Sequence, residues 1–289
     1  MQTHVSIPSD GLELAAVLHV PDGAQGSLPA IVVMHGFGGN KDGETHLIEA
    51  LMYENLGYVV LRFDMRGCGE SGGVPGRIIC QDQVADVRNV VTWLRASPYV
   101  AQGRVLLSGQ SFGAAVGLFA GAVDDRVAGV IAIGGWGDGL QKSRDQHATP
   151  QAWARFSELM AQGQRHREQT GQSLWVERWD IVPVPESLRS HLPPGSVMTF
   201  SAETMASICS FRPRDVIDQL APRPLLLVHS ASDSVTPTAQ AIGVFEAAGK
   251  GAELVLLTDV DHFPFADGGT RLRSIVEGWL ARYFPLQSR

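Results

Sequence analysis

The feature that most constrains the fold is a serine enclosed by glycines at residues 109–113, which read Gly-Gln-Ser-Phe-Gly. An apolar run at 105–107 precedes this segment, separated from it by Ser108, and a run of mostly small residues at 114–118 follows it. This order is typical of a buried strand that passes through a tight turn into a helix, with Ser111 at the apex. The glycines remove side chains where the strand and the helix nearly touch. The pattern therefore predicts a serine oxygen held clear of the sheet, at a helix N-terminus whose free N–H groups stabilise negative charge.

The remainder of the chain alternates apolar runs with helical patterns. Strands are expected at 30–34, 58–63, 104–107, 127–133, 224–229 and 253–257, after an N-terminal β-hairpin formed by 5–7 and 12–20. Helices are expected at 45–56, 82–96 and 238–248, and a closing helix carries Leu272, Ile275, Val276, Trp279 and Tyr283 on one face. Alternation of this kind with buried strands predicts an α/β protein with a mostly parallel sheet covered by helices on both faces.

This alternation stops between residues 137 and 212, where polar helix-like stretches such as 151–167 occur and no strand of the earlier type is expected. An insertion between two late strands is expected to cover the strand ends, where ligands of open α/β sheets bind. We therefore expect a core domain formed by residues 1–136 and 213–289, with residues 137–212 as a helical cap or lid.

A serine hydroxyl is a weak nucleophile near neutral pH, so it needs a base and an acid that orients the base. Where the serine lies in a strand–turn–helix segment, these partners come later in the sequence, in the order serine, acid, histidine. Asp233 comes just after the strand expected at 224–229, and His262 comes just after the last expected strand. We predict that His262 takes the proton of Ser111 and that Asp233 holds the imidazole.

Other residues compete for these two roles. His229 lies at the end of its strand but precedes the acid, and His35 lies beside a glycine-rich loop, so both are expected to have structural roles. Asp259 and Asp261 are neighbours of His262 in sequence and are expected to make loop or cap hydrogen bonds. These two histidines and two acids remain the alternatives to His262 and Asp233.

The glycine-rich loop at 35–41 directly follows the strand expected at 30–34. Acyl transfer produces an oxyanion, and two backbone N–H donors must already point at its position. One donor is expected to be the N–H of Phe112, immediately after the serine, and the other the N–H of Phe37.

Together these segments resemble the α/β-hydrolase-fold serine hydrolases over nearly the whole chain outside the insertion. The segments that match are 35–38, 63–71 and 109–113, together with Asp233 and His262. Segments 35–41 and 66–73 further resemble feruloyl and cinnamoyl esterases and dienelactone-hydrolase-like or peptidase-like relatives. The chain departs from those esterases in the length and aromatic content of its insertion. The resemblance implies an α/β-hydrolase fold and a Ser-His-Asp triad.

Cofactor and metal sites are not expected. Residues 67–72 fit the pattern G-x-G-x-x-G, but a Val-Pro-Gly stretch follows where a helix should begin. The lysine at the end of 38–41 lacks the spacing of a phosphate-binding loop, and the histidines show no metal-ligand spacing with cysteines or acids.

The insertion is the place where we expect substrate specificity to arise. It is rich in large apolar side chains, namely Trp153, Trp175, Trp179, Met198, Phe200, Met205 and Phe211. One hypothesis is that they form the wall of an acyl or aromatic pocket, with Trp136 and Trp175 contacting the substrate. The alternative, favoured residue by residue, is that most of them anchor the insertion to the core.

Composition excludes several other classes of protein. The net charge of −7 and the lack of a Lys/Arg-rich run argue against nucleic-acid binding. The first residues are neither basic nor apolar, and no apolar run approaches the roughly 18 residues that span a bilayer, so neither a signal peptide nor a membrane partner is expected. Three scattered cysteines argue for a reducing compartment, which predicts a cytoplasmic protein.

The sequence thus predicts a cofactor-independent serine hydrolase that acts on the ester bond of a small molecule through an acyl-enzyme. Acyl transfer, or thioester or peptide cleavage by the same triad, is the alternative. An intact serine, acid and histidine argue against a non-catalytic binding module. A homodimer is left open.

Overall fold

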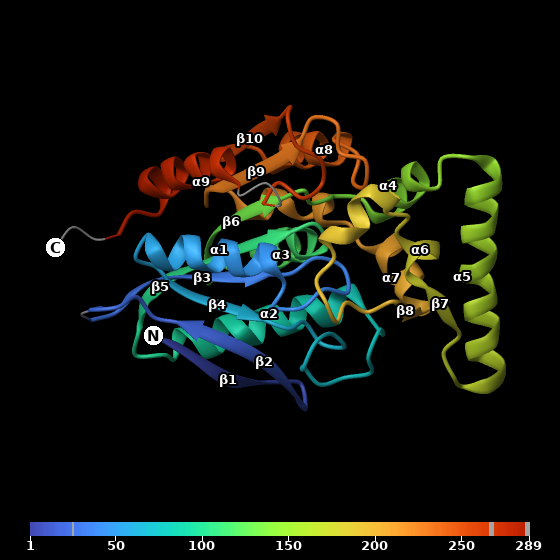
Figure 1. Cartoon of the computed structure of the whole chain (residues 1–289), viewed down its shortest axis with the longest axis horizontal. Coiled ribbons are helices and arrows are strands. Elements are labelled where there is room, and N and C mark those ends of the chain that lie inside the picture. The colour runs from blue at the N-terminus through green and yellow to red at the C-terminus, as the bar shows by residue number, and fades with distance from the viewer. Residues whose placement is uncertain (25, 266–268, 287–289) are drawn as a thin grey trace.

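The computed structural model describes residues 1–24, 26–265 and 269–286, and its centre is an eight-stranded sheet (Figure 1). The strand order is β1-β2-β4-β3-β5-β6-β9-β10. The strands are β1 (Gln2–Ser9), β2 (Leu12–His19), β3 (Leu28–Met34), β4 (Val59–Phe63), β5 (Val100–Gln110), β6 (Val127–Ile133), β9 (Leu225–Ser230) and β10 (Ala252–Leu257). From β4 to β10 neighbouring strands run parallel, whereas β1 and β2 form the expected hairpin and join β4 antiparallel.

Helices cover both faces of this sheet because side chains alternate along each buried strand. Ile31 and Val33 of β3 pack in one cluster with α1 (Glu44–Asn55) and α9 (Thr270–Tyr283). Ala30, Val32 and Met34 point the other way, into a second cluster with α2 (Cys80–Arg95), α3 (Phe112–Val123) and α8 (Ala239–Ala248). Within the described ranges, no helix combines the length and hydropathy that crossing a membrane requires.

The segment between β6 and β9 forms a separate mass at one end of the sheet, with α5 farthest out (Figure 1). It contains α4 (Gly139–Gln146), α5 (Pro150–Thr170), β7 (Trp175–Glu177), α6 (Arg178–Ile181), β8 (Thr199–Ser201) and α7 (Glu203–Ser210). It also contains 3-10 turns at Glu186–His191, Pro213–Asp215 and Ile217–Leu220. The strands β7 and β8 pair antiparallel, a feature absent from the sequence prediction. Strands of three residues are too short to show a period of two.

Candidate active site

Ser111 lies at the turn between β5 and α3, with φ 52° and ψ −112°. A Cβ atom at Gly109 would lie 2.5 Å from the carbonyl of Gly113, and one at Gly113 would lie 2.5 Å from the carbonyl oxygen of His35. Both positions therefore require glycine. The Ser111 N–H donates a hydrogen bond of 2.8 Å to the Ile133 carbonyl, which fixes the turn to the neighbouring strand.

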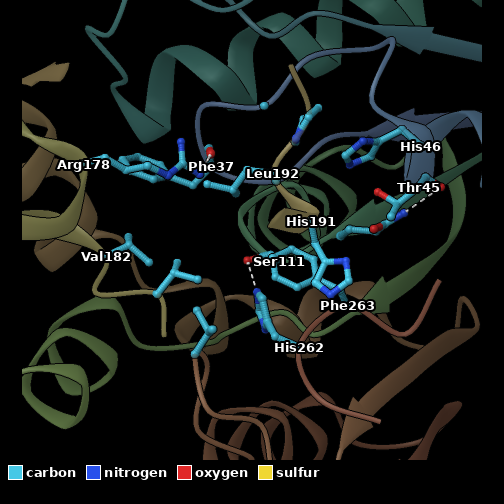
Figure 2. A pocket seen from close by; sticks show the side chains of 16 residues that line it. Phe37, Thr45, His46, Ser111, Arg178, Val182, His191, Leu192, His262 and Phe263 are labelled. Atoms are coloured by element: carbon cyan, nitrogen blue, oxygen red, sulfur yellow. Dashed lines mark hydrogen bonds between the residues drawn. The ribbon is translucent and has the colours of Figure 1, made fainter. Parts of the chain in front are cut away.

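Three residues that are far apart in sequence meet at this turn. The Ser111 Oγ lies 2.9 Å from Nε2 of His262, as the dashed line in Figure 2 shows. The Nδ1 of His262 lies 2.8 Å from Oδ2 of Asp233. Asp233 follows β9 and His262 follows β10, so the parallel sheet brings both residues to the edge at which β5 ends.

The environment of Asp233 keeps its carboxylate ionised. Burial raises its pKa, but the neighbouring His262 and hydrogen bonds outweigh burial and hold the pKa below its usual value. Its Oδ1 accepts the N–H groups of Val235 at 2.8 Å and Thr236 at 2.6 Å. A carboxylate can only accept, so Nδ1 of His262 carries the proton and Nε2 is left to accept the proton of Ser111.

The two competing histidines support the surrounding backbone. His229 Nε2 bonds the carbonyl of Thr236 at 2.9 Å and lies 3.4 Å from Asp233, and burial lowers the pKa of His229. His35 accepts the N–H of Met65 through Nε2 at 3.0 Å, so its ring is held by the backbone. Neither ring is hydrogen-bonded to Ser111 within the described residues.

The two competing acids make local contacts as well. Asp261 accepts the N–H groups of Ser234 and His262, each at 2.8 Å, and so ties together the loops that carry the acid and the histidine. Asp259 is exposed and lies 3.0 Å from Arg271. The geometry therefore favours Asp233 as the partner of the imidazole.

Two backbone N–H groups lie beside the serine without a hydrogen-bond acceptor. Over the described ranges, the amides of Phe37 and Phe112 donate no hydrogen bond to protein. Phe112 begins α3 directly after Ser111. The loop that carries Phe37 passes close to the serine, because a Cβ atom at Gly36 would lie 3.6 Å from Cβ of Ser111. Both predicted donors are thus free to bind an oxyanion.

The segment between β6 and β9 holds this loop in place. Arg178 donates through Nη2 to the Phe37 carbonyl at 2.5 Å, and the Val197 N–H donates to the Gly38 carbonyl at 2.8 Å. The Phe37 and Phe200 rings stack with their centroids 4.3 Å apart. The Arg178 side chain is buried, and burial lowers its pKa to about 10. Sequence reasoning missed Arg178, which belongs to no motif.

Two cavities open at Ser111. The larger, of about 50 Å³, also reaches His262, and Figure 2 shows the side chains around it. The insertion contributes Arg178, Val182, Val184, His191, Leu192 and Pro193 to its lining. At another point of this lining lies His46, whose buried ring nitrogens have no partner within the described residues. Burial lowers the pKa of His46 to about 3, so its ring is neutral.

The smaller cavity, of about 10 Å³, lies on another side of Ser111. Its lining consists of Phe37, Ser111, Phe112, Trp136, Lys142, Val182, Ile208, Val235 and Thr236. Trp136 is therefore at the site, as the sequence analysis expected. Trp175 is not, because on β7 the buried side chain is that of Val176, and Trp175 is 46% exposed.

The apolar side chains expected to form the pocket wall line neither of these two cavities. Phe200, Met205 and Phe211 are buried in the core cluster instead, and Trp153 and Trp179 pack partly buried against it. Anchoring of the insertion, the alternative stated from sequence, describes these residues. The residues of the insertion that do line the site include aliphatic ones, and the aromatic content of the sequence gives no indication of them.

In the described part of the chain, no group of three or more His, Cys, Asp or Glu side chains is arranged so that it could hold a metal ion. The thiols of Cys68 and Cys80 are buried, which raises the pKa of each to about 12. They therefore keep their protons and are not competing nucleophiles.

The chain is similar in sequence and in structure to several known proteins. The chain is 27% identical over 270 residues to a polyketide transferase from Penicillium sp, covering 90% of this chain and 88% of that protein. A hypothetical protein from Pseudomonas aeruginosa superposes with a TM-score of 0.84 at 22% identity, over 98% of this chain and 94% of that one. An α/β hydrolase from Penicillium sp. sh18 gives 0.79 at 24% identity, over 98% and 99%.

These structural neighbours confirm the predicted α/β-hydrolase fold. A family model described as X-Pro dipeptidyl-peptidase (S15 family) matches residues 10–263, which is most of the chain. The protein belongs to this S15 family of α/β-hydrolase-fold serine hydrolases.

Proposed function

We propose that the protein hydrolyses a carboxylic ester through a covalent acyl-enzyme on Ser111. The observation that carries this proposal is the continuous hydrogen-bond chain from Ser111 through His262 to Asp233, at 2.9 and 2.8 Å. The tautomer fixed by Asp233 leaves Nε2 of His262 ready to accept a proton from the serine hydroxyl.

Each step of the reaction then has a residue for it. Ser111 Oγ forms a bond to the acyl carbon while its proton passes to His262 Nε2, and the N–H groups of Phe37 and Phe112 bind the oxyanion. The ester C–O bond then breaks, and His262 returns the proton to the leaving alcohol. Water repeats the sequence, with His262 as base, and releases the acid and free Ser111.

We assign the two cavities to the alcohol and acyl parts of the ester from the position of His262, which is the general acid. The leaving group must lie beside His262, which lines the larger cavity, so that cavity takes the alcohol part of the ester. The smaller cavity is shared by Ser111, Phe37 and Phe112, and it takes the acyl part. Because this cavity is the smaller of the two, the acyl group is short.

A second candidate function is acyl transfer, in which an alcohol or amine replaces water in the deacylation step. Its support is that two relatives are named polyketide transferases, from Penicillium sp at 27% identity and from Stachybotrys chlorohalonatus at 26%. The family description adds a peptide bond as a third substrate class for the same triad.

The first experiment measures p-nitrophenol release from p-nitrophenyl esters of increasing acyl length by the wild type and by Ser111→Ala. We expect turnover that is fastest for short acyl groups and at least about 10³-fold lower in the variant, because the nucleophile is lost. A burst without turnover, relieved by an added acceptor alcohol, would establish acyl transfer instead. Cleavage of an X-Pro p-nitroanilide but of no ester would establish a peptidase. Turnover retained in Ser111→Ala would refute the covalent mechanism.

A further inference from the structure

The smaller cavity contains a lysine that has no partner. The Lys142 side chain, on α4, is 4% exposed, and no hydrogen bond or ion pair to its ammonium group occurs in the described part of the chain. Its Nζ lies over the Trp136 ring, 5.5 Å from the ring centroid. The other lysines are accommodated differently, because Lys41 is held by three carboxylates and Lys250 is exposed.

A second polar group in the same cavity also lacks a partner. The Thr236 side chain is fully buried, and its Oγ1 makes no hydrogen bond within the described residues. Thr236 and Lys142 both line the cavity beside Ser111. The remaining lining is apolar apart from Ser111, and it comes from Phe37, Phe112, Trp136, Val182, Ile208 and Val235. A buried polar group without a partner lowers stability, so the Thr236 hydroxyl is suited to an oxygen supplied by a ligand, and the Lys142 side chain lines the same cavity.

Among the described residues, no carboxylate forms an ion pair with Lys142. The titratable groups around it are the thiols of Cys80 and Cys209 and the carboxylate of Asp233. Burial raises the pKa of both thiols, which stay uncharged, and Asp233 is already bonded to His262 and two amides. Burial lowers the pKa of Lys142 to about 8, so the side chain is still mostly protonated at neutral pH.

We propose that Lys142 and Thr236 form a carboxylate-binding subsite, so that the acyl group transferred to Ser111 is short and ends in a carboxylate. This inference rests on the proposed function, and it narrows the substrate class to half-esters of small dicarboxylic acids. The position follows from the assignment of the smaller cavity to the acyl group. A carboxylate matches the two polar side chains, because Lys142 supplies a positive charge with N–H donors and Thr236 supplies a hydroxyl donor.

The test compares esters of the same shape that differ in charge. Monomethyl succinate is matched by methyl 4-methylpentanoate, and monomethyl malonate by methyl 3-methylbutanoate. Methanol release is measured for the wild type, Lys142→Met, Thr236→Val and Ser111→Ala, with Lys250→Met as the control that removes an exposed lysine. The measured quantity is the ratio of kcat/KM for the charged ester to that for its neutral partner.

We expect the wild type to prefer the charged ester of at least one pair by about tenfold or more. Lys142→Met should lower the ratio by at least about tenfold and Thr236→Val by a smaller factor, since a hydrogen bond to a charged group contributes more than one between neutral groups. Lys250→Met should not change it. A ratio that is equal in the wild type and Lys142→Met would overturn the proposal.

If Lys142→Met does not fold, the wild type alone decides. Monomethyl succinate should then compete with the hydrolysis of p-nitrophenyl acetate more strongly than neutral methyl 4-methylpentanoate, and equal competition would overturn the subsite. The two proposals fail differently. Absence of Ser111-dependent turnover of every ester, p-nitrophenyl acetate included, would overturn the proposed function and the subsite with it. Ser111-dependent turnover with no preference for the charged ester would overturn the subsite alone.

Discussion

At the scale of single residues, the site depends on a serine in an unusual backbone conformation. Ser111 has φ 52°, in the left-handed region that residues other than glycine rarely adopt. Such a conformation costs on the order of 1–3 kcal/mol and persists only where the surroundings impose it. Here the close approach of Gly109 to Gly113 and the hydrogen bond to Ile133 impose it, and together they direct Oγ toward His262.

Asp233 is the residue whose role can be tested most sharply. We expect Asp233→Asn to lower kcat/KM for p-nitrophenyl acetate by about 10³- to 10⁴-fold, because an amide donates to Nδ1 and places the imidazole proton on Nε2, facing Ser111. Asp259→Asn is the matched control, since Asp259 is exposed and contacts only Arg271 among the described residues. Equal activities of the two variants would remove Asp233 from the mechanism.

At the scale of elements, the insertion completes the site by fixing the loop after β3. The carbonyls of Phe37 and Gly38 accept hydrogen bonds from Arg178 and Val197, so their peptide planes cannot rotate freely. The Phe37 N–H lies in the preceding peptide plane, whose Gly36 carbonyl accepts the Gly39 N–H at 3.0 Å, and the contacts from the insertion hold the loop that carries this plane beside Ser111. Arg178 does not contact the reacting atoms, and it is a positioning residue for the oxyanion donor.

Replacing Arg178 should therefore lower the rate of the chemical step, and hence kcat, while substrate binding changes less. We expect Arg178→Met to lower kcat for p-nitrophenyl acetate by about 10- to 100-fold with KM changed by less than about threefold, because charge-assisted hydrogen bonds contribute about 1.5–3 kcal/mol. Arg189→Met is the control, since Arg189 also packs on an insertion aromatic, Trp179, but within the described residues donates hydrogen bonds only to the Val184 carbonyl. A matching loss in both variants would mean that the insertion is merely destabilised.

The sequence could indicate that Ser111, Asp233 and His262 lie together, but not which residues the insertion contributes. Asp233 and His262 each follow a strand with a clear apolar pattern, and the ends of parallel strands meet at one edge of a sheet. Arg178 reaches Phe37 across 141 positions from a segment without periodicity, so nothing local indicates the contact. For the aromatic residues of the insertion, the sequence left a pocket wall open beside the favoured role as an anchor, because large apolar side chains serve both equally well. Phe200 and Phe211 form the anchor.

At the scale of the whole molecule, one buried carboxylate links a helix on one face of the sheet to the strand that carries the nucleophile. Glu49 of α1 accepts hydrogen bonds from the Ser108 hydroxyl at 2.5 Å and from the Gln110 amide at 2.6 Å. Ser108 and Gln110 are in β5, just before Ser111. All of its partners are neutral, and burial raises the pKa of Glu49 to about 7.

This carboxylate makes the stability of the fold depend on pH. The pKa of Glu49 rises from an ordinary 4.5 to about 7 on folding, so the folded state retains a proton that the unfolded chain releases, and stability falls as pH increases between these values. We expect Glu49→Gln, which cannot ionise, to gain about 3 kcal/mol of unfolding free energy relative to the wild type as pH rises from about 4.5 to above 7. Urea unfolding followed by tryptophan fluorescence at several pH values measures this difference. Glu277→Gln, at an exposed ion pair with Arg273, should show a difference that hardly varies with pH. If the Glu49→Gln difference were equally flat, the buried carboxylate would not be the source of the pH dependence.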